Sequence, residues 1–185
     1  GQVGNKKDSK LKMSFKEATS LMQTSQISKI ASRSDDYGGF QQPWGLAYGD
    51  LGSVQFAEVS VNTDTGFVKV DRIIAAHSCG RPLNIGQLES QINGGIIQGI
   101  SYALYENRGR DKGTGHMMNA NVDQYKVPFS MEIPEIETLI VEEYSALSST
   151  DAYGIGEPAN IATAAAVANA VYNAIGARLY EIPIT

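Results

Sequence analysis

The chain lacks the residues that several common classes of protein require. A single cysteine, Cys79, excludes an internal disulfide framework. No run of about twenty apolar residues is present, so no segment is expected to span a membrane. Lysine and arginine total 15 against 20 acidic residues, and the net charge of −5 argues against a nucleic-acid-binding surface.

The composition is typical of a globular chain, with 42% hydrophobic and 8% aromatic residues. A length of 185 residues suits one ordinary domain or a piece of a larger one. Gly1 stands where an initiator methionine is expected, which indicates that the natural N-terminus lies elsewhere. The missing signal peptide therefore leaves the cellular location open.

The first fifty residues are predicted to form a short helix and a linker. Ser14 is followed three residues later by Glu17, the capping-box pattern that opens a helix. Residues 32–45 are polar and contain glycine, as linkers commonly do. We therefore predict a poorly defined N-terminal region at 1–50 and the main region at 51–185.

A β-hairpin is predicted between residues 54 and 76. Val54–Val61 alternates as a half-buried strand. One of its faces carries Gln55, Ala57, Val59 and Val61. Asn62–Gly66 is the turn, with Gly66 supplying the left-handed backbone position, and 67–76 is the returning strand.

A loop at 77–84 joins this hairpin to a helix. His77 and Cys79 are potential metal ligands, but a structural zinc site needs four ligands and the only other histidine is His116. A Cys–His nucleophilic pair lacks an identifiable third group to orient it. A glycine-containing loop between strand and helix is better suited to hold a phosphate or pterin group through backbone N–H groups.

The helix is predicted to run from Gly86 to Glu106. Its apolar side consists of Leu88, Ile92, Ile96, Ala103 and Leu104. Three glycines lie inside it, Gly94, Gly95 and Gly99. Each glycine costs about 1 kcal/mol relative to alanine, so something is expected to approach the backbone closely, either a ligand or a second helix. Gln91 and Gln98 are seven residues apart and should point the same way.

Residues 136–144 are predicted to form a further strand after an irregular, charged stretch. The candidate buried residues of this strand are Ile136, Leu139, Ile140 and Val141. The order of helix, hairpin, helix, strand and helix predicts an α+β fold. In this fold a β-hairpin and further strands pack with two main helices.

A Gly-x-Gly-Glu turn at 153–157 leads into the last helix. Pro158 suits the first helical turn, and Gly176 ends the helix. The predicted buried face consists of Ile161, Ala165, Ala168, Val171, Tyr172 and Ile175. Glu157 is then at or beside the N-cap, where the helix dipole favours a carboxylate. The turn is open to two interpretations, a simple capped helix or a backbone cradle for an anion or a metal-bound oxygen.

Together these segments resemble, in order, the xanthine dehydrogenase and aldehyde oxidase family. Within that family the chain is most similar to the molybdenum-binding subunit of bacterial aldehyde oxidoreductases. The resemblance covers roughly Val54–Thr185. The matching blocks are Asp64–Gly66, Cys79–Asn84, Gln91–Gly99, Asn119–Pro128, the Gly154–Glu157 turn with its helix, and Pro183–Thr185.

The resemblance implies a molybdenum–molybdopterin cofactor in its cytosine dinucleotide form. The implied cofactor-binding residues are Gly80, Arg81, Leu83, Asn84, Gln91, Tyr153, Gly154, Ile155 and Gly156. Glu157 is implied to be the catalytic base in the oxidative hydroxylation of an aldehyde or N-heterocycle, with water as the oxygen source. A base must be ionised before it acts, and a helix N-terminus favours that state.

A full molybdenum subunit of this family is several times longer, so the chain is expected to be its C-terminal portion, either truncated or from a split gene. Alone it should be inactive. The implied partners are the remainder of that subunit, iron–sulfur and FAD subunits or domains, and a small-molecule substrate. The alternative is a non-catalytic assembly or binding module in which Glu157 only caps a helix. A stand-alone nucleotide-binding protein is disfavoured, because neither a P-loop nor a Rossmann fingerprint is present.

Overall fold

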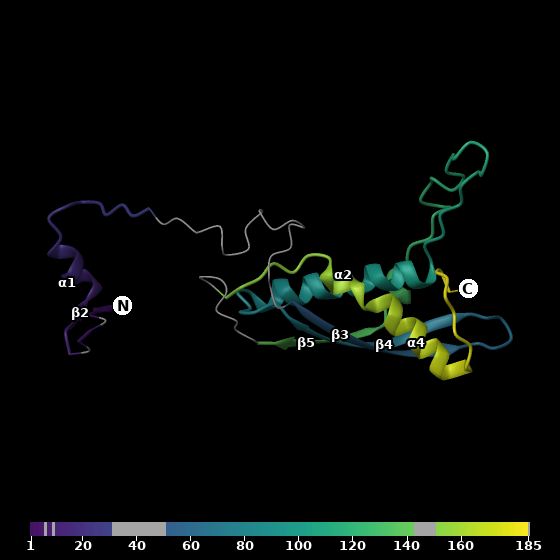
Figure 1. The fold of residues 1–185 in the computed structure, drawn as a ribbon, viewed down its shortest axis with the longest axis horizontal. Helices are drawn as coiled ribbons and strands as arrows, with labels where there is room; N and C mark the ends of the chain where they lie inside the picture. Colours follow the sequence, from purple (N-terminus) through teal and green to yellow (C-terminus); the bar gives the residue numbers. More distant parts are fainter. Residues whose placement is uncertain (6, 9, 31–50, 143–150, 185) are drawn as a thin grey trace. The chain divides into compact units, whose positions relative to one another are not determined.

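The computed structural model describes residues 1–5, 7–8, 10–30, 51–142 and 151–184. The chain divides into two compact units, Gly1–Tyr37 and Gly38–Thr185 (Figure 1). The predicted linker at 32–45 lies outside the described residues. A domain boundary at residue 50 therefore stays a prediction.

The first unit is a small β-hairpin followed by one short helix. β1 (Gln2–Gly4) pairs antiparallel with β2 (Lys12–Ser14), and α1 (Phe15–Ser20) follows directly. The predicted capping box is confirmed. The Glu17 amide donates to the Ser14 hydroxyl (3.2 Å), and the Ser14 amide donates to the Glu17 carboxylate (2.9 Å).

The second unit is built on a three-stranded sheet in the order β3-β4-β5. β3 (Gly52–Val61) and β4 (Val68–Ser78) are antiparallel, and Gly66 in the turn between them has φ 78°. This confirms the predicted hairpin. β4 is longer than predicted, because His77 and Ser78 belong to the strand rather than to the following loop. Both residues are buried, and His77 is only 1% exposed.

β5 (Glu135–Val141) pairs parallel with β4. The connection between these strands contains α2 (Ile85–Leu104), which lies within two residues of the predicted helix at both ends. α3 (Pro158–Ile161) and α4 (Thr163–Ile175) follow β5. Figure 1 shows the helices covering one face of the sheet.

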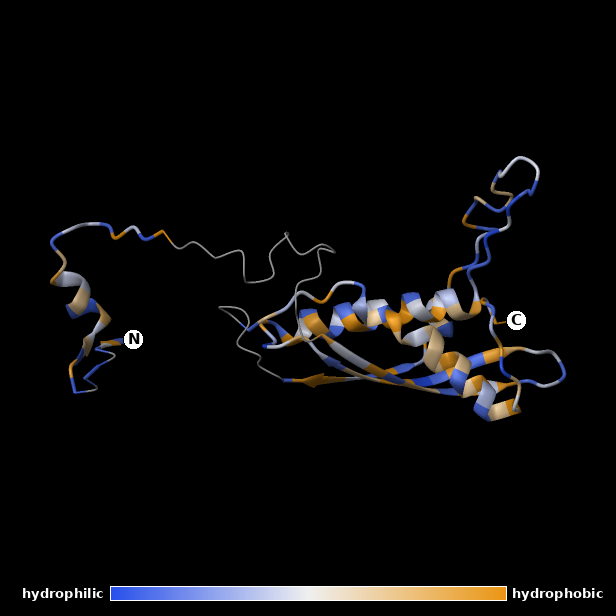
Figure 2. Ribbon diagram, viewed as in Figure 1, coloured by the Kyte–Doolittle hydropathy of each residue, from blue (hydrophilic) through white to orange (hydrophobic). Residues whose placement is uncertain are grey.

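A single hydrophobic core fills the space between the sheet and the helices. Its largest fully buried aliphatic residues are Ile73, Ile92, Ile96, Ile100, Val167 and Val171, each no more than 2% exposed. Figure 2 shows hydrophobic residues recurring along α2 and along the strands. A sheet with helices on one face, sharing one core, confirms the predicted α+β fold.

The last helix differs from the prediction in two respects. It is interrupted at Ala162, so α3 is a separate helix of four residues. The predicted buried face was also largely wrong. Val171 is buried and Ala168 packs half-buried against the core, but Ile161, Ala165, Tyr172 and Ile175 are exposed. The buried side instead begins at Thr163, which is 0% exposed and which a hydrophobic pattern does not count.

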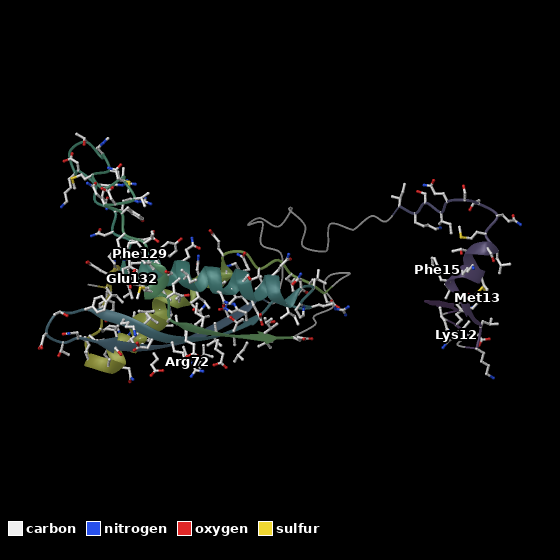
Figure 3. The ribbon with its side chains drawn as sticks, turned by 180° about the vertical axis from the view of Figure 1, so that it is seen from behind. Lys12, Met13, Phe15, Arg72, Phe129 and Glu132 are labelled. Atoms are coloured by element: carbon white, nitrogen blue, oxygen red, sulfur yellow. The ribbon has the colours of Figure 1, made fainter. Side chains whose placement is uncertain are left out.

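The predicted burial of β5 was also wrong in part, on the outer face of the sheet that is turned away from the helices. Leu139 and Val141 were predicted to be buried, yet they are 47% and 44% exposed. Side chains alternate along a strand, so when Ile136 and Ile140 face the helices, Leu139 and Val141 point outward. Arg72 also lies on this outer face, where it forms an ion pair with Glu137 (Figure 3).

Residues 107–134 form an arm that projects from the end of α2 (Figure 1). An isolated bridge between Arg110 and Met117 holds its outer part together. Near its base a 3₁₀ helix, η2 (Ser130–Glu132), follows Phe129, whose amide donates to the Glu132 carboxylate at 2.7 Å (Figure 3). Among the described residues, no helix has both the length and the apolar character needed to cross a bilayer.

Candidate functional site

The parallel pairing of β4 with β5 brings two segments of the predicted site to one edge of the sheet. Ser78 and Val141, at the carboxyl ends of these strands, are partners in the register. The Cys79–Asn84 loop begins at this edge directly after β4. Residues 151–153, which come after β5, return to the same edge and lie against that loop.

The contact between the two segments is made by backbone groups. Gly80 and Ala152 form an isolated antiparallel bridge. Two hydrogen bonds flank it, from the Arg81 amide to the Asp151 carbonyl (2.7 Å) and from the Tyr153 amide to the Cys79 carbonyl (3.0 Å). The loop and the turn, predicted as separate parts of a site, are therefore joined.

Gly80 is required where the two segments meet. Its φ of +71° is in the left-handed region that favours glycine. A Cβ at this position would also overlap the Asp151 carbonyl oxygen and lie 2.8 Å from the ring of Tyr153. Gly80 thus contacts the neighbouring segment of the protein directly.

The Gly154–Glu157 turn is open on its outer side. A Cβ built on Gly154 or on Gly156 has no neighbouring atom within 4 Å. Within the described part of the chain, the amides of Gly154, Ile155 and Gly156 donate no hydrogen bond. The turn therefore combines unpaired N–H donors with room for another group beside them.

Glu157 occupies the N-cap position of α3, but its side chain does not cap the helix. The carboxylate is exposed, and no hydrogen bond or ion pair to it is formed by the described residues. Because α3 has only four residues, its dipole is small, and the predicted influence of a long helix on Glu157 does not apply. The carboxylate remains available to act on another molecule.

Gln91 and Gln98 point the same way, as their spacing predicted, and both bind the segment around Glu157. The Gln91 side-chain amide donates to the Gly156 carbonyl at 3.0 Å. The Gln98 side-chain oxygen accepts from the Asn160 side-chain amide, also at 3.0 Å. These bonds attach the residues on either side of Glu157 to α2.

The glycines of α2 allow this close packing. A Cβ on Gly95 would lie 2.5 Å from the Cβ of Ala159, and one on Gly99 would overlap the side chain of Thr163. Of the two interpretations left open by the sequence, contact with a second helix is therefore the one that holds for Gly95 and Gly99. Gly94 is different, because nothing lies within 4 Å of a Cβ built there.

The remaining predicted cofactor residues are at the start of α2. Asn84 is the N-cap, and its side-chain oxygen accepts from the Gln87 amide at 3.1 Å. Leu83 is 74% exposed, and Arg81 is exposed as well. Neither Leu83 nor Asn84 forms a hydrogen bond with the Glu157 turn among the described residues.

His77 and Cys79, the other chemically reactive residues of this region, are buried. Burial lowers the pKa of His77 and raises the pKa of the Cys79 thiol, because the charged form of each is poorly solvated. The His77 ring nitrogen Nε2 lies 3.5 Å from the Ser53 hydroxyl. Over the described ranges no three His, Cys, Asp or Glu side chains are grouped to hold a metal ion.

One residue of the site was not singled out from the sequence. Gln55 was predicted only as one position of an alternating strand, but its side chain binds both Ala159 and Thr163. The available signal was a polar residue on the face that carries Ala57, Val59 and Val61. Such a residue needs hydrogen-bond partners when it is buried.

Comparison with known families identifies the fold that carries this site. The family model described as a molybdopterin cofactor-binding domain matches residues 2–134. The chain belongs to the molybdopterin cofactor-binding domain family. This match begins at residue 2, well before the predicted range of the resemblance at Val54–Thr185, and it ends before the Gly154–Glu157 turn.

Curated relatives of this molybdopterin cofactor-binding domain include subunits of several oxidoreductases. The aldehyde oxidoreductase molybdenum-binding subunit PaoC of Escherichia coli K12 is 38% identical over 131 residues, covering 70% of this chain and 18% of PaoC. The nicotine 6-hydroxylase large subunit of Paenarthrobacter nicotinovorans is 35% identical over 130 residues, covering 69% of this chain and 16% of that subunit. The chain thus spans less than a fifth of the length of these relatives.

Solved structures agree. The aldehyde oxidoreductase of Desulfovibrio gigas matches with a TM-score of 0.66 and 29% identity, over 72% of this chain and 14% of that one. Quinoline 2-oxidoreductase of Pseudomonas putida 86 matches with a TM-score of 0.64 and 30% identity, over 69% of this chain and 16% of that one. The chain therefore matches, in sequence and in fold, one part of the molybdenum-binding subunits of larger oxidoreductases.

Proposed function

We propose that this chain supplies the general base of a molybdenum hydroxylase, and that the base is Glu157. The reaction is the oxidative hydroxylation of an aldehyde or an N-heterocycle, with water as the oxygen source. One observation carries this proposal. Glu157 presents an exposed carboxylate that caps nothing, beside an open glycine turn whose backbone is fixed to α2 and to the 79–84 loop.

The residues present fit a molybdopterin cofactor. The amides of Gly154, Ile155 and Gly156, which donate to none of the described residues and have open space beside the glycines, suit an anionic or strongly polar group. The Oδ1 atom of Asp151 is buried and has no hydrogen-bond partner in the described part of the structure. This oxygen is an acceptor suited to the N–H groups of a pterin ring.

The start of α2 suits the phosphate groups of such a cofactor. α2 is 20 residues long, and its Asn84-capped N-terminus directly follows the Gly80–Leu83 loop. The positive end of a helix of this length favours an anion. We propose that Arg81, Leu83 and Asn84 contact the nucleotide end of the cofactor, and that this end is a cytosine dinucleotide, as the family resemblance implies.

Glu157 would act on the oxygen nucleophile. When bound, the cofactor supplies the two-electron oxidation of the substrate carbon. The Glu157 carboxylate takes the proton from the water-derived oxygen as that oxygen attacks the carbon. Gln91, which holds the Gly156 carbonyl, fixes the backbone from which the Glu157 side chain extends, so that the backbone needs little reorganisation during the reaction.

The complete enzyme would include further chains or domains. Relatives such as PaoC are named as molybdenum-binding subunits, which supports partner subunits for the protein that contains this chain. We propose that these partners carry iron–sulfur and FAD groups, which remove the electrons after each turnover. The isolated 185-residue chain is expected to be inactive.

The test is Glu157→Gln in the complete enzyme, assayed with aromatic aldehydes and an artificial electron acceptor. A general base contributes about 10²- to 10⁴-fold to the rate, so kcat should fall by that factor with the molybdenum content unchanged. Glu181→Gln, which changes another exposed glutamate, is the control and should keep full activity. Unchanged turnover by the Glu157→Gln enzyme would contradict the proposal and favour the assembly-module alternative.

A further inference from the structure

Gln55 is a polar side chain buried in the core-facing side of β3. It is 8% exposed, and its neighbours on that face, Ala57 and Val59, pack against the hydrophobic core. Both ends of its side-chain amide are used. The nitrogen donates to the Ala159 carbonyl at 2.7 Å, and the oxygen accepts from the Thr163 hydroxyl at 2.7 Å.

The two partners of Gln55 flank the break between α3 and α4. Ala159 belongs to α3, Thr163 is the first residue of α4, and both are 0% exposed. One side chain therefore ties both helices to the sheet across the break at Ala162. A buried amide that lost either partner would leave a polar group unsatisfied, so the three groups depend on one another.

This arrangement fixes the position of Glu157. Glu157 is two residues before Ala159, and its carbonyl accepts from the Asn160 amide at 2.9 Å. On the opposite side, Gly95 of α2 contacts Ala159 so closely that no Cβ fits between them. The segment after Glu157 is thus held between α2 and β3, and Gln55 provides the polar contact from β3.

We propose that Gln55 is a positioning residue for the proposed base Glu157, acting through Ala159 and Thr163. This inference rests on the proposed function. Misplacing a catalytic group by about 1 Å can cost about 100-fold in rate. Loss of the Gln55 contacts should therefore reduce kcat without affecting substrate binding or cofactor loading.

The test compares Gln55→Met, Thr163→Val and Thr163→Ser in the complete enzyme. Methionine keeps the length of the side chain without its polar atoms, and serine keeps the hydroxyl that valine lacks. We expect kcat to fall about 10- to 100-fold for Gln55→Met and Thr163→Val, with KM and molybdenum content unchanged. Thr163→Ser should retain most of the activity. Gln124→Met, at an exposed glutamine of the arm, is the matched control.

Two further measurements separate positioning from a general loss of structure. Added to Glu157→Gln, Gln55→Met should lower kcat no further, because the group that it positions is already gone. Amide hydrogen exchange at residues 157–163 should become faster in Gln55→Met and stay unchanged in Gln124→Met.

Either of two results would overturn the inference. One is an unchanged kcat in Gln55→Met, and the other is that Gln55→Met lowers kcat by the same factor in the wild type and in Glu157→Gln. A Glu157→Gln enzyme with full turnover would instead overturn the proposed function. In that case the exchange experiment still decides. Faster exchange at 157–163 supports the tether by Gln55, and unchanged exchange overturns it. If Gln55→Met does not fold, kcat of Thr163→Val is compared with kcat of Thr163→Ser. A loss of kcat in the valine variant alone supports the inference, and equal kcat in the two variants overturns it.

Discussion

The side-chain amide of Gln91 donates a 3.0 Å hydrogen bond to the carbonyl of Gly156, the residue immediately before Glu157. Gln91→Met removes this bond and keeps a side chain of similar length and helix propensity. A hydrogen bond contributes about 0.5–1.5 kcal/mol, so amide exchange at residues 154–157 should become about two- to tenfold faster. Gln87→Met, one turn earlier on the same helix, is the control. Equal exchange in the two variants would show that Gln91 does not hold the turn.

Substitution by alanine should have opposite effects on stability at two glycines of α2, Gly94 and Gly99. A Cβ on Gly99 would lie 2.6 Å from the Thr163 hydroxyl oxygen, whereas one on Gly94 meets nothing within 4 Å. Gly99→Ala should destabilise the protein by about 1–3 kcal/mol through overpacking. Gly94→Ala should stabilise it by about 0.5–1 kcal/mol through helix propensity. Thermal unfolding of the complete subunit measures both, and a rise in Tm for Gly99→Ala would contradict the packing described here.

Gly66 and Gly80 allow the cost of a left-handed backbone to be distinguished from the cost of steric overlap. Gly66 and Gly80 have similar φ angles of 78° and 71°, but only Gly80 has neighbours within reach of a Cβ. Gly66→Ala should cost about 1–2 kcal/mol from the left-handed backbone alone. Gly80→Ala should cost about 2–5 kcal/mol and displace Tyr153, and with it reduce the molybdenum content. Similar effects of the two substitutions on Tm and on metal content would contradict this distinction.

Burial of His77 predicts a pH dependence of stability. Its pKa is lowered because the charged imidazolium is poorly solvated in the fold. As the pH falls below the unfolded value of about 6.5, the unfolded state takes up a proton that the folded state does not. Stability is therefore lost on acidification, by up to about 1.4 kcal/mol per pH unit, and levels off below the folded pKa.

The His77 prediction is measured as the opening free energy of amides in β3 and β4 by hydrogen exchange between pH 7.5 and 5. His77→Gln should remove this component of the pH dependence. His116→Gln, at an exposed histidine of the arm, should leave it in place. An identical pH dependence in wild type and His77→Gln would show that another group is responsible.

Local sequence signals predicted the elements that depend on local structure. The alternation of Val54–Val61, the left-handed position of Gly66 and the 3.6-residue repeat of α2 each gave an element within about two residues of its observed bounds. The spacing of Gln91 and Gln98 correctly predicted that both side chains point the same way from α2. These features depend on backbone geometry that is the same in any fold.

Features that depend on tertiary partners were predicted less well. Tyr172 and Ile175 of α4 are exposed. The chain breaks at Ala162, and Thr163 bonds to Gln55 of β3, so the side of α4 that carries Thr163 faces the sheet. Leu139 was placed in the core because it is apolar, although the pleat of β5 turns it outward. The candidate site itself was located from a family resemblance. Spacing alone left the Gly-x-Gly-Glu turn open to a simple capped helix.

The projecting arm is at the far end of α2 from the candidate site. α2 begins beside the 79–84 loop and extends for 20 residues, about 30 Å, before the arm starts. The arm ends where β5 begins, opposite the edge to which residues 151–153 return. A change of length in the outer part of the arm, between Arg110 and Met117, would therefore not displace Glu157. Its tip around Gly113 is also a suitable place to attach a fluorophore or an affinity peptide to the working enzyme.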